Sequence, residues 1–177
     1  RPEYRRILMA DAQGKIIVAA DPAAIGHSVA DRTAFHETLG LAATGLTLGY
    51  IEDITYDEEL GAYVMCFGYP LLDQTTPHHD APSLPATNIG VVLITVDVQP
   101  TVYQILTEWR TGHSGAAVLS RAEGDETRIL NHVAGDEARP LQRVLPPPTA
   151  PQTALPAYLA ARGQEGAQLS IDHLQAE

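Results

Sequence analysis

The sequence predicts an α+β fold in which an antiparallel sheet carries flanking helices. Three observations lead to this prediction. Short β-rich runs occur in pairs joined by tight polar turns, which makes neighbouring strands antiparallel. Single helical segments separate or follow those pairs. Finally, the 177-residue chain is 45% hydrophobic and 19% charged, which is enough apolar material for a core and too much for a disordered chain.

A hairpin and a helix come first. Residues 7–10 and 16–19 are apolar and β-rich, and Gly14 stands in the turn between them, where a positive φ is usual. A helix is expected next, because Asp31 is a good N-cap and Phe35 begins an apolar face with a helical period. This helix should end at the glycines that follow it.

A second hairpin and a long strand come next. Residues 46–56 alternate in polarity, as a half-buried strand does, and residues 57–61 form a polar turn. Residues 62–69 are the returning strand, which Pro70 is expected to end. The apolar run over residues 89–98 predicts a strand that is buried on both faces.

The later part of the chain predicts a smaller second lobe. A proline-rich stretch over residues 73–88 is expected to be an exposed loop, and residues 100–110 have a helical period. After residue 111 we expect short elements, namely strands at 116–120, 127–130 and 168–171 and a helix at 155–162. These are too few to complete a second module.

Composition excludes several classes of function. With 11 Lys plus Arg against 22 Asp plus Glu, the net charge of −11 argues against nucleic acid as a partner. No stretch reaches the roughly 18 to 20 apolar residues that a membrane helix needs. The single cysteine, Cys66, lies in an apolar run and is expected to be a buried thiol. Walker, dinucleotide-binding and His-Glu-x-x-His motifs are absent, so we expect neither a cofactor nor catalysis.

Several short motifs follow one another in a recognisable order. They are the Asp-x-x-Gly hairpin turn and Ile25-Gly26, the helix start Arg32-Thr-Ala-Phe35, the strand 49–54, Pro70-Leu71, and the strand that opens with Gly90-Val91 and ends near Asp97. In this order they resemble the Cache family of extracytoplasmic sensors, over about residues 4–109. A weaker resemblance, to the second module of double Cache sensors, begins at residues 112–116.

The resemblance implies a fold and a division into modules. Residues 1–110 would form a PAS-like five-stranded antiparallel sheet with flanking helices, the membrane-distal Cache module. Residues 111–177 would form a partial, membrane-proximal PAS-like module. The family's amino-acid-recognition pattern, an Arg closely followed by a Trp-Tyr pair, is absent from this sequence. An amino-acid ligand is therefore not implied.

The resemblance also implies a function and a location. The chain would be the periplasmic, small-molecule-sensing part of an inner-membrane signal transduction protein, with a sensor histidine kinase of a two-component system as the expected output. A diguanylate cyclase, a chemoreceptor, or a structural or dimerisation module without a ligand are the alternatives, and homodimerisation is left open. The abrupt start at Arg1 indicates a fragment, so the flanking membrane helices would lie outside this chain.

Side chains near the expected cleft between sheet and helix are the candidate ligand contacts. They are Arg32, Phe35, His36, Tyr50, Asp53, Tyr63 and Asp97. Arg32 would suit a carboxylate ligand, because a guanidinium holds two oxygens at once; its other interpretation is a surface pair with Asp31 or Glu37. Phe35 also fits the core, His36 also fits an exposed helix face, and Asp97 also fits a helix cap.

Metal and hydrolase interpretations find weaker support. The run His78-His79-Asp80 lacks further ligands at a defined spacing, so no metal site is expected. Ser114 stands in a segment similar to a nucleophile elbow, but a helix precedes it and a strand follows, whereas the elbow needs the reverse order. A soluble hydrolase is thus the least supported alternative.

Overall fold

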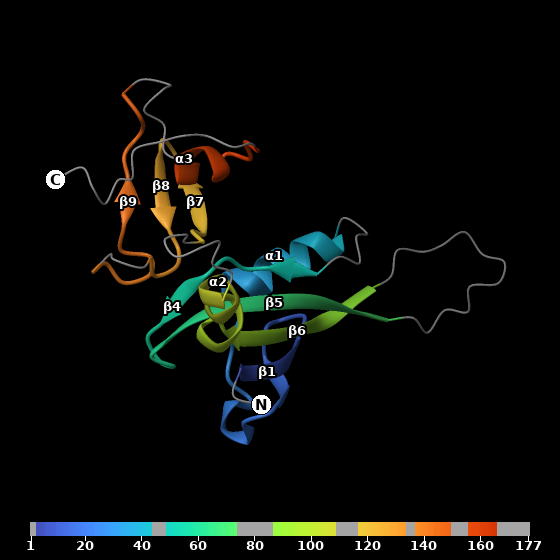
Figure 1. Cartoon of the computed structure of the whole chain (residues 1–177). Coiled ribbons are helices and arrows are strands. Elements are labelled where there is room, and N and C mark those ends of the chain that lie inside the picture. Colours follow the sequence, from blue (N-terminus) through green and yellow to red (C-terminus); the bar gives the residue numbers. More distant parts are fainter. Residues whose placement is uncertain are drawn as a thin grey trace. The chain divides into compact units, whose positions relative to one another are not determined.

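The computed structural model describes residues 3–43, 49–73, 87–108, 117–133, 137–149 and 156–165. The chain divides into two compact units, Arg1–Pro100 and Thr101–Glu177. The first unit contains an antiparallel sheet with helices, and the second contains a smaller sheet (Figure 1). The predicted α+β class is confirmed, and the larger sheet is compatible with a PAS-like fold. The module limits 1–110 and 111–177 stay a prediction.

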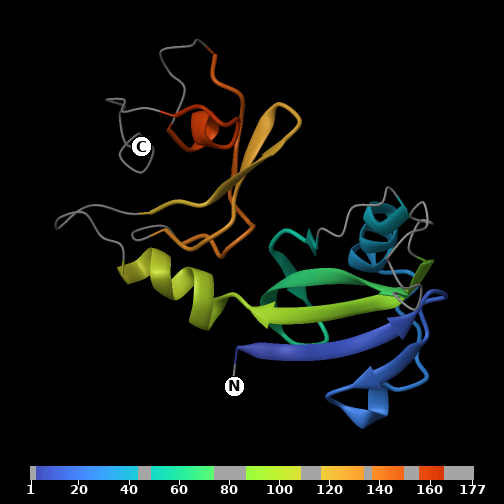
Figure 2. The ribbon, with the colours of Figure 1, turned by 90° about the vertical axis from the view of Figure 1, so that its right-hand side faces the viewer.

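The larger sheet is antiparallel throughout. Its strands are β1 (Tyr4–Asp11), β2 (Ile16–Ala19), β3 (Tyr50–Ile51), β4 (Thr55–Asp57), β5 (Ala62–Asp73) and β6 (Thr87–Asp97). They lie in the order β2-β1-β6-β5-β3, and β4 also pairs with β5. The long middle strands run side by side in both views of the ribbon (Figures 1 and 2). The predicted first hairpin is confirmed, with Gly14 at φ 85° in its turn.

The sheet has six strands where five were predicted, because the single strand expected over residues 46–56 is divided. Ile54 interrupts it: its side chain is 1% exposed, and its backbone N–H donates to the Asp53 carboxylate at 2.7 Å. This local hydrogen bond takes the place of a ladder bond. Residues 44–48 lie outside the described part of the chain.

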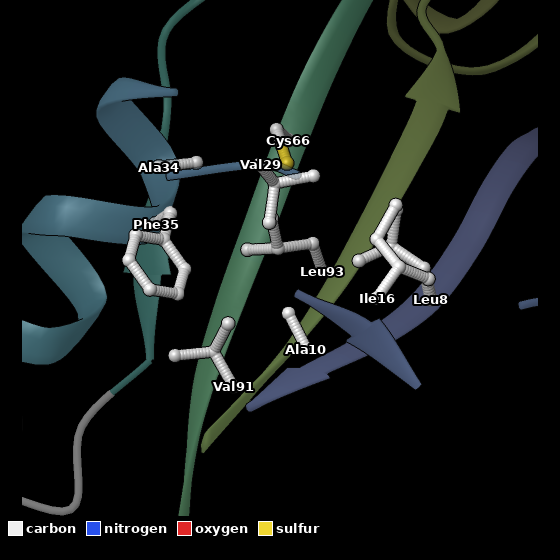
Figure 3. Packing of buried hydrophobic residues seen from close by; sticks show 9 residues of the cluster. All are labelled: Leu8, Ala10, Ile16, Val29, Ala34, Phe35, Cys66, Val91 and Leu93. Atoms are coloured by element: carbon white, nitrogen blue, oxygen red, sulfur yellow. The ribbon is translucent and has the colours of Figure 1, made fainter. Parts of the chain in front are cut away.

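One face of the sheet is covered by helix α1 (Thr33–Ala43), and we call it the inner face. The core lies between this helix and the strands. It consists of Leu8, Ala10, Ile16, Val29, Ala34, Phe35, Cys66, Val91 and Leu93. Figure 3 shows Ala34 and Phe35 reaching from α1 toward the sheet residues. The expectation that Cys66 is a buried thiol is confirmed.

The opposite, outer face is much less buried. On β6 the inward residues Val91 and Leu93 are buried, whereas the outward residues Val92 and Ile94 are only partly buried. The prediction that this strand is buried on both faces is therefore wrong, because α1, the long helix of the first unit, covers only the inner side of the sheet. The predicted end at Pro70 is also wrong, since β5 continues to Asp73. Among the described residues, the pairing of β3 with β5 ends at Gly68. Pro70, which has no N–H, therefore interrupts no described hydrogen bond between these two strands.

The second unit is built around a three-stranded sheet. Its elements are the π-helical turn η2 (Gln99–Tyr103), α2 (Gln104–Glu108), β7 (Ser120–Glu123), β8 (Glu126–Ile129), β9 (Val144–Leu145) and α3 (Pro156–Ala160). The strand predicted at 127–130 is confirmed as β8, but its partner β7 begins only at Ser120, so the strand predicted at 116–120 was placed too early; β9 was not predicted. Ile129, Val133 and Leu145 form its core. The strand expected at 168–171 lies outside the described residues, as do residues 74–86.

Two absences hold for the described residues alone. None of the helices in this part of the chain is long and apolar enough to span a membrane. Over the same residues, no group of His, Cys, Asp and Glu side chains is arranged to hold a metal ion. The run His78-His79-Asp80 and Ser114 lie outside the described residues.

Candidate functional site

Arg32 lies directly before α1 and is half-buried. Its charge acts on Glu52, which follows β3: burial raises the pKa of the Glu52 carboxyl, and the Arg32 guanidinium partly opposes that rise. Among the described residues, no ion pair joins Arg32 to Asp31 or Glu37, the surface partners that the sequence suggested. Arg32 thus interacts electrostatically with a carboxyl at the sheet edge.

Tyr50 on β3 lies near the same carboxylate. The ring packs against the core, and burial raises the pKa of its phenol, with the negative charges of Glu52, Glu37 and Asp53 adding to the rise. Both Arg32 and Tyr50 thus interact electrostatically with the Glu52 carboxyl. That they contact a ligand stays a prediction.

Phe35 belongs to the core rather than to a cavity. Its side chain is 2% exposed and packs among Val29, Val91 and Leu93 (Figure 3). His36, the next residue, is exposed and meets the Phe35 ring edge-on, with 5.7 Å between ring centroids. At this position the space between α1 and the sheet, where a cleft was expected, is filled with side chains.

Tyr63 faces away from Tyr50. Tyr50 pairs with Gly68, which lies on the inner face against Thr38 of α1, whereas Tyr63 is an odd number of residues from Gly68 along β5. Its partner across the strands is Tyr56, at 5.0 Å between ring centroids. The prediction that Tyr50 and Tyr63 line one pocket is wrong, because they occupy opposite faces of the sheet.

The two candidate aspartates are already engaged in hydrogen bonds within the protein. Asp53 is exposed and accepts the backbone N–H of Ile54. Asp97, at the end of β6, is 5% exposed; one of its oxygens accepts from Nε and Nη2 of Arg5 at 3.0 and 2.5 Å, and the other accepts the backbone N–H of Gln99 at 2.9 Å. The alternative interpretation of Asp97 as a cap for the following helical turn matches this geometry.

An open pocket lies over β1, and we call it the β1 pocket. Its volume is about 350 Å³. Two segments flank it: the short 3₁₀ helix η1 (Pro22–Ala24) with the residues around it, and the turn between β4 and β5. It is lined by Arg5, Arg6, Ile7, Leu8, Ala19, Ala20, Asp21, Ala23, Ala24, His27, Glu59 and Leu60. The apolar members are mostly alanines, and the polar members are mostly ionisable.

Arg6 is the central charge of this pocket. It pairs in register with Thr95, which places it on the inner face beside Leu8. Its Nη1 donates to Asp57 at 2.6 Å, and its Nη2 donates to Glu59. Burial opposes ionisation of Asp57, but the Leu60 backbone N–H and the Arg6 guanidinium outweigh it and lower the pKa of this carboxyl.

Arg5 is the second arginine that lines the β1 pocket. It donates to Asp97, which in turn holds the backbone of Gln99. The pocket is therefore linked by two hydrogen-bonded steps to the point where the chain leaves the sheet. Sequence reasoning missed Arg5 and Arg6, although two adjacent arginines at the start of an apolar strand are an available signal, because a charge on the inner side of a strand needs a partner.

No protein-family model and no curated protein matches the chain. One similar solved structure is described as an extracellular ligand binding receptor from Desulfohalobium retbaense, at 12% sequence identity and a TM-score of 0.42. The similarity covers 72% of this chain and 27% of the receptor, so the chain spans about a quarter of the receptor's length.

Proposed function

We propose that this chain is the extracytoplasmic, small-molecule-sensing region of a membrane-bound signal transduction protein. The β1 pocket is the observation that carries the proposal. Its volume of about 350 Å³ falls in the usual range of ligand sites, and it combines an apolar floor with a few convergent charged groups. The pocket lies on a sheet whose arrangement is compatible with a PAS-like fold, which supports the sensor interpretation.

The signal would arise from the two segments that flank the β1 pocket. A ligand that contacts both η1 and the β4–β5 turn favours the arrangement in which both segments reach it. The difference between its affinities for the two arrangements sets how far the equilibrium shifts. The pairs from Arg5 to Asp97 and from Asp97 to Gln99 connect the pocket wall with the start of η2. A change at the pocket would thereby bias the chain segment that leads into the second unit.

The rest of the proposal is supported by the sequence resemblance. The parent protein would be a sensor histidine kinase of a two-component system, with a diguanylate cyclase or a chemoreceptor as alternatives. The chain would lie in the periplasm, outside the inner membrane, and would itself catalyse no reaction.

The test is a ligand screen by thermal shift with a variant that blocks the pocket. A ligand present at 100 times its dissociation constant should stabilise the chain by about 2.7 kcal/mol. Ala23→Trp, which fills the β1 pocket from η1, should abolish that shift. Ala43→Trp, an equally bulky change at the exposed end of α1 and away from the pocket, should preserve it. A hit that survives Ala23→Trp, or a broad screen without hits, contradicts the proposal.

A second candidate function is a dimerisation module, and the outer face favours it. Ile7, Phe67 and Tyr69 on this face are 42%, 36% and 53% exposed. The paired outer positions from Ile7 to Met9, Tyr63 to Tyr69 and Val92 to Val96 carry no charge. In a chain of net charge −11, a neutral apolar face is where a second copy can approach without repulsion. Light scattering on the chain and on Phe67→Glu tests it: the dimer should form and then be lost in the variant.

A further inference from the structure

We propose that the β1 pocket binds a small molecule with a carboxylate group. Without ligand, Glu59 contacts the Arg6 guanidinium at the point where the ligand's carboxylate would bind, and the ligand displaces it. This inference rests on the proposed function, because it names the ligand class of the same site. It also assigns a regulatory part to the β4–β5 turn. Arg6 already contacts two carboxylates, those of Asp57 and Glu59.

The two carboxylates are held very differently. The side chains of Arg6 and Asp57 are each 18% exposed, and both oxygens of Asp57 are engaged, one by Arg6 and one by the Leu60 N–H at 3.0 Å. Glu59 is 79% exposed and contacts Arg6 through a single oxygen. An ion pair so open to water contributes about 0–1 kcal/mol. The Asp57 contact is thus structural, and the Glu59 contact is exchangeable.

A ligand carboxylate is a stronger partner for the same guanidinium. It would form a charge-assisted hydrogen bond with Nη2 of Arg6 while Glu59 turns out into solvent, and the rest of the ligand would contact the apolar floor of the pocket. The net charge around Arg6 would stay the same in this exchange, because one carboxylate replaces another. Arg5 and His27 also line the pocket and offer donors to a second polar group.

The pocket also sets the size of the ligand. Its volume of about 350 Å³ is at the lower end of the range for small-molecule sites, and its apolar floor is provided by Leu8 and small alanine side chains. A short-chain acid fits these dimensions, whereas a lipid or a peptide does not. An amine that pairs with Glu59 itself is the competing ligand class, and the experiment below separates the two.

The experiment measures binding of four probes at constant ionic strength: propionate, succinate, propylamine and propionamide. Isothermal titration calorimetry of the chain and of Glu59→Gln shows whether removal of the Glu59 charge strengthens or weakens binding of each probe. Removing the competing charge should strengthen binding of the acids about three- to fivefold, since that is the upper range of a surface ion pair. Glu58→Gln, a neighbouring exposed residue of the same turn that does not contact Arg6, is the matched control and should change it less than twofold.

Three results would overturn the inference. One is that Glu59→Gln weakens propylamine binding and leaves the acids unchanged, which assigns the pocket to a cation. Another is that propionamide binds as well as propionate, which removes the need for the charge. The last is that neither acid binds to the chain or to the variant. In the first two cases the sensing function would still be supported if Ala23→Trp abolished binding of the probe. In the last case the wider ligand screen tests the sensing function separately.

Discussion

The two ends of the inner face differ in how they are covered. Under α1 the side chains of Phe35, Val91 and Leu93 are at most 2% exposed and fill the space completely. Over β1 the covering element is η1, a three-residue helix whose inward residues are alanines. Ala24 packs against the core, but the short side chains of η1 leave space over β1, and this space is the β1 pocket. The comparison indicates that the pocket in which we propose a ligand lies where the cover is thin.

The largest expected effect concerns the packed end. Phe35→Ala should lower the free energy of unfolding by about 3–5 kcal/mol, because it removes a fully buried aromatic ring from the core. Chemical denaturation followed by circular dichroism measures this. His36→Ala, the exposed neighbour, should change stability by less than about 0.5 kcal/mol. Equal effects of the two changes would mean that the space under α1 is not tightly packed.

The close approach of α1 to the sheet gives the next effect. A Cβ atom added at Gly68 would stand 1.9 Å from Oγ1 of Thr38 and 3.2 Å from the Ala34 carbonyl oxygen, so Gly68→Ala should destabilise the chain by about 1–3 kcal/mol. At Gly40, on the same helix, an added Cβ meets nothing within 4 Å, and Gly40→Ala should stabilise by up to about 1 kcal/mol. The melting temperatures of the two variants should move in opposite directions, and a shift of both the same way would refute this packing.

The open end is tested by exchanging its central cation. Arg6→Lys keeps the charge but loses the planar fork, so we expect acid probes to bind about tenfold more weakly, which corresponds to about 1.4 kcal/mol. Arg32→Lys, outside the β1 pocket, should leave binding within twofold. If the Arg32 variant loses binding and the Arg6 variant keeps it, the ligand site lies beside Arg32, as the sequence alone suggested.

The smallest effect is the pH dependence of stability. The pKa of Asp57 is lowered in the folded chain from the ordinary value of 3.8, so its pairing with Arg6 stabilises the fold fully above that value. This stability is lost as the pH falls below 3.8 and through the folded pKa. Asp57→Asn should therefore cost about 1 kcal/mol at neutral pH and less in acid. Melting curves at pH 7 and pH 3 measure this, and a difference that does not shrink in acid would contradict the ion pair.

Much of the fold could be predicted from local patterns. The hairpins, the helix after Asp31 and the antiparallel sheet follow from residue periodicity and turn chemistry, which act within a few residues. The divided strand at Ile54 could not be predicted, because a side-chain hydrogen bond from Asp53 competes there with the ladder. The exposed outer face of β6 could not be predicted either, since an apolar run does not say which of its sides another element covers.

The candidate site was predicted less well for a physical reason. The structure places Tyr50 on the inner face and Tyr63 on the outer face. The registers of β3 and β4 with β5 decide which way each residue faces, and a turn pattern does not fix these registers. Arg6 gains its place only through contacts with Asp57 and Glu59, which are 51 and 53 positions away in the chain. Such long-range pairs are a property of the fold.

The account is tested most directly by mapping where an acid probe binds. In a two-dimensional amide NMR titration with succinate, we expect the largest shifts at residues 19–21, 23 and 24, at Leu60 and at the side-chain Nε–H of Arg6. The amides of Phe35 and Val91 should hardly move. Shifts centred on α1 and β6 instead would contradict the account, because they would place the ligand in the end of the inner face that is described here as packed.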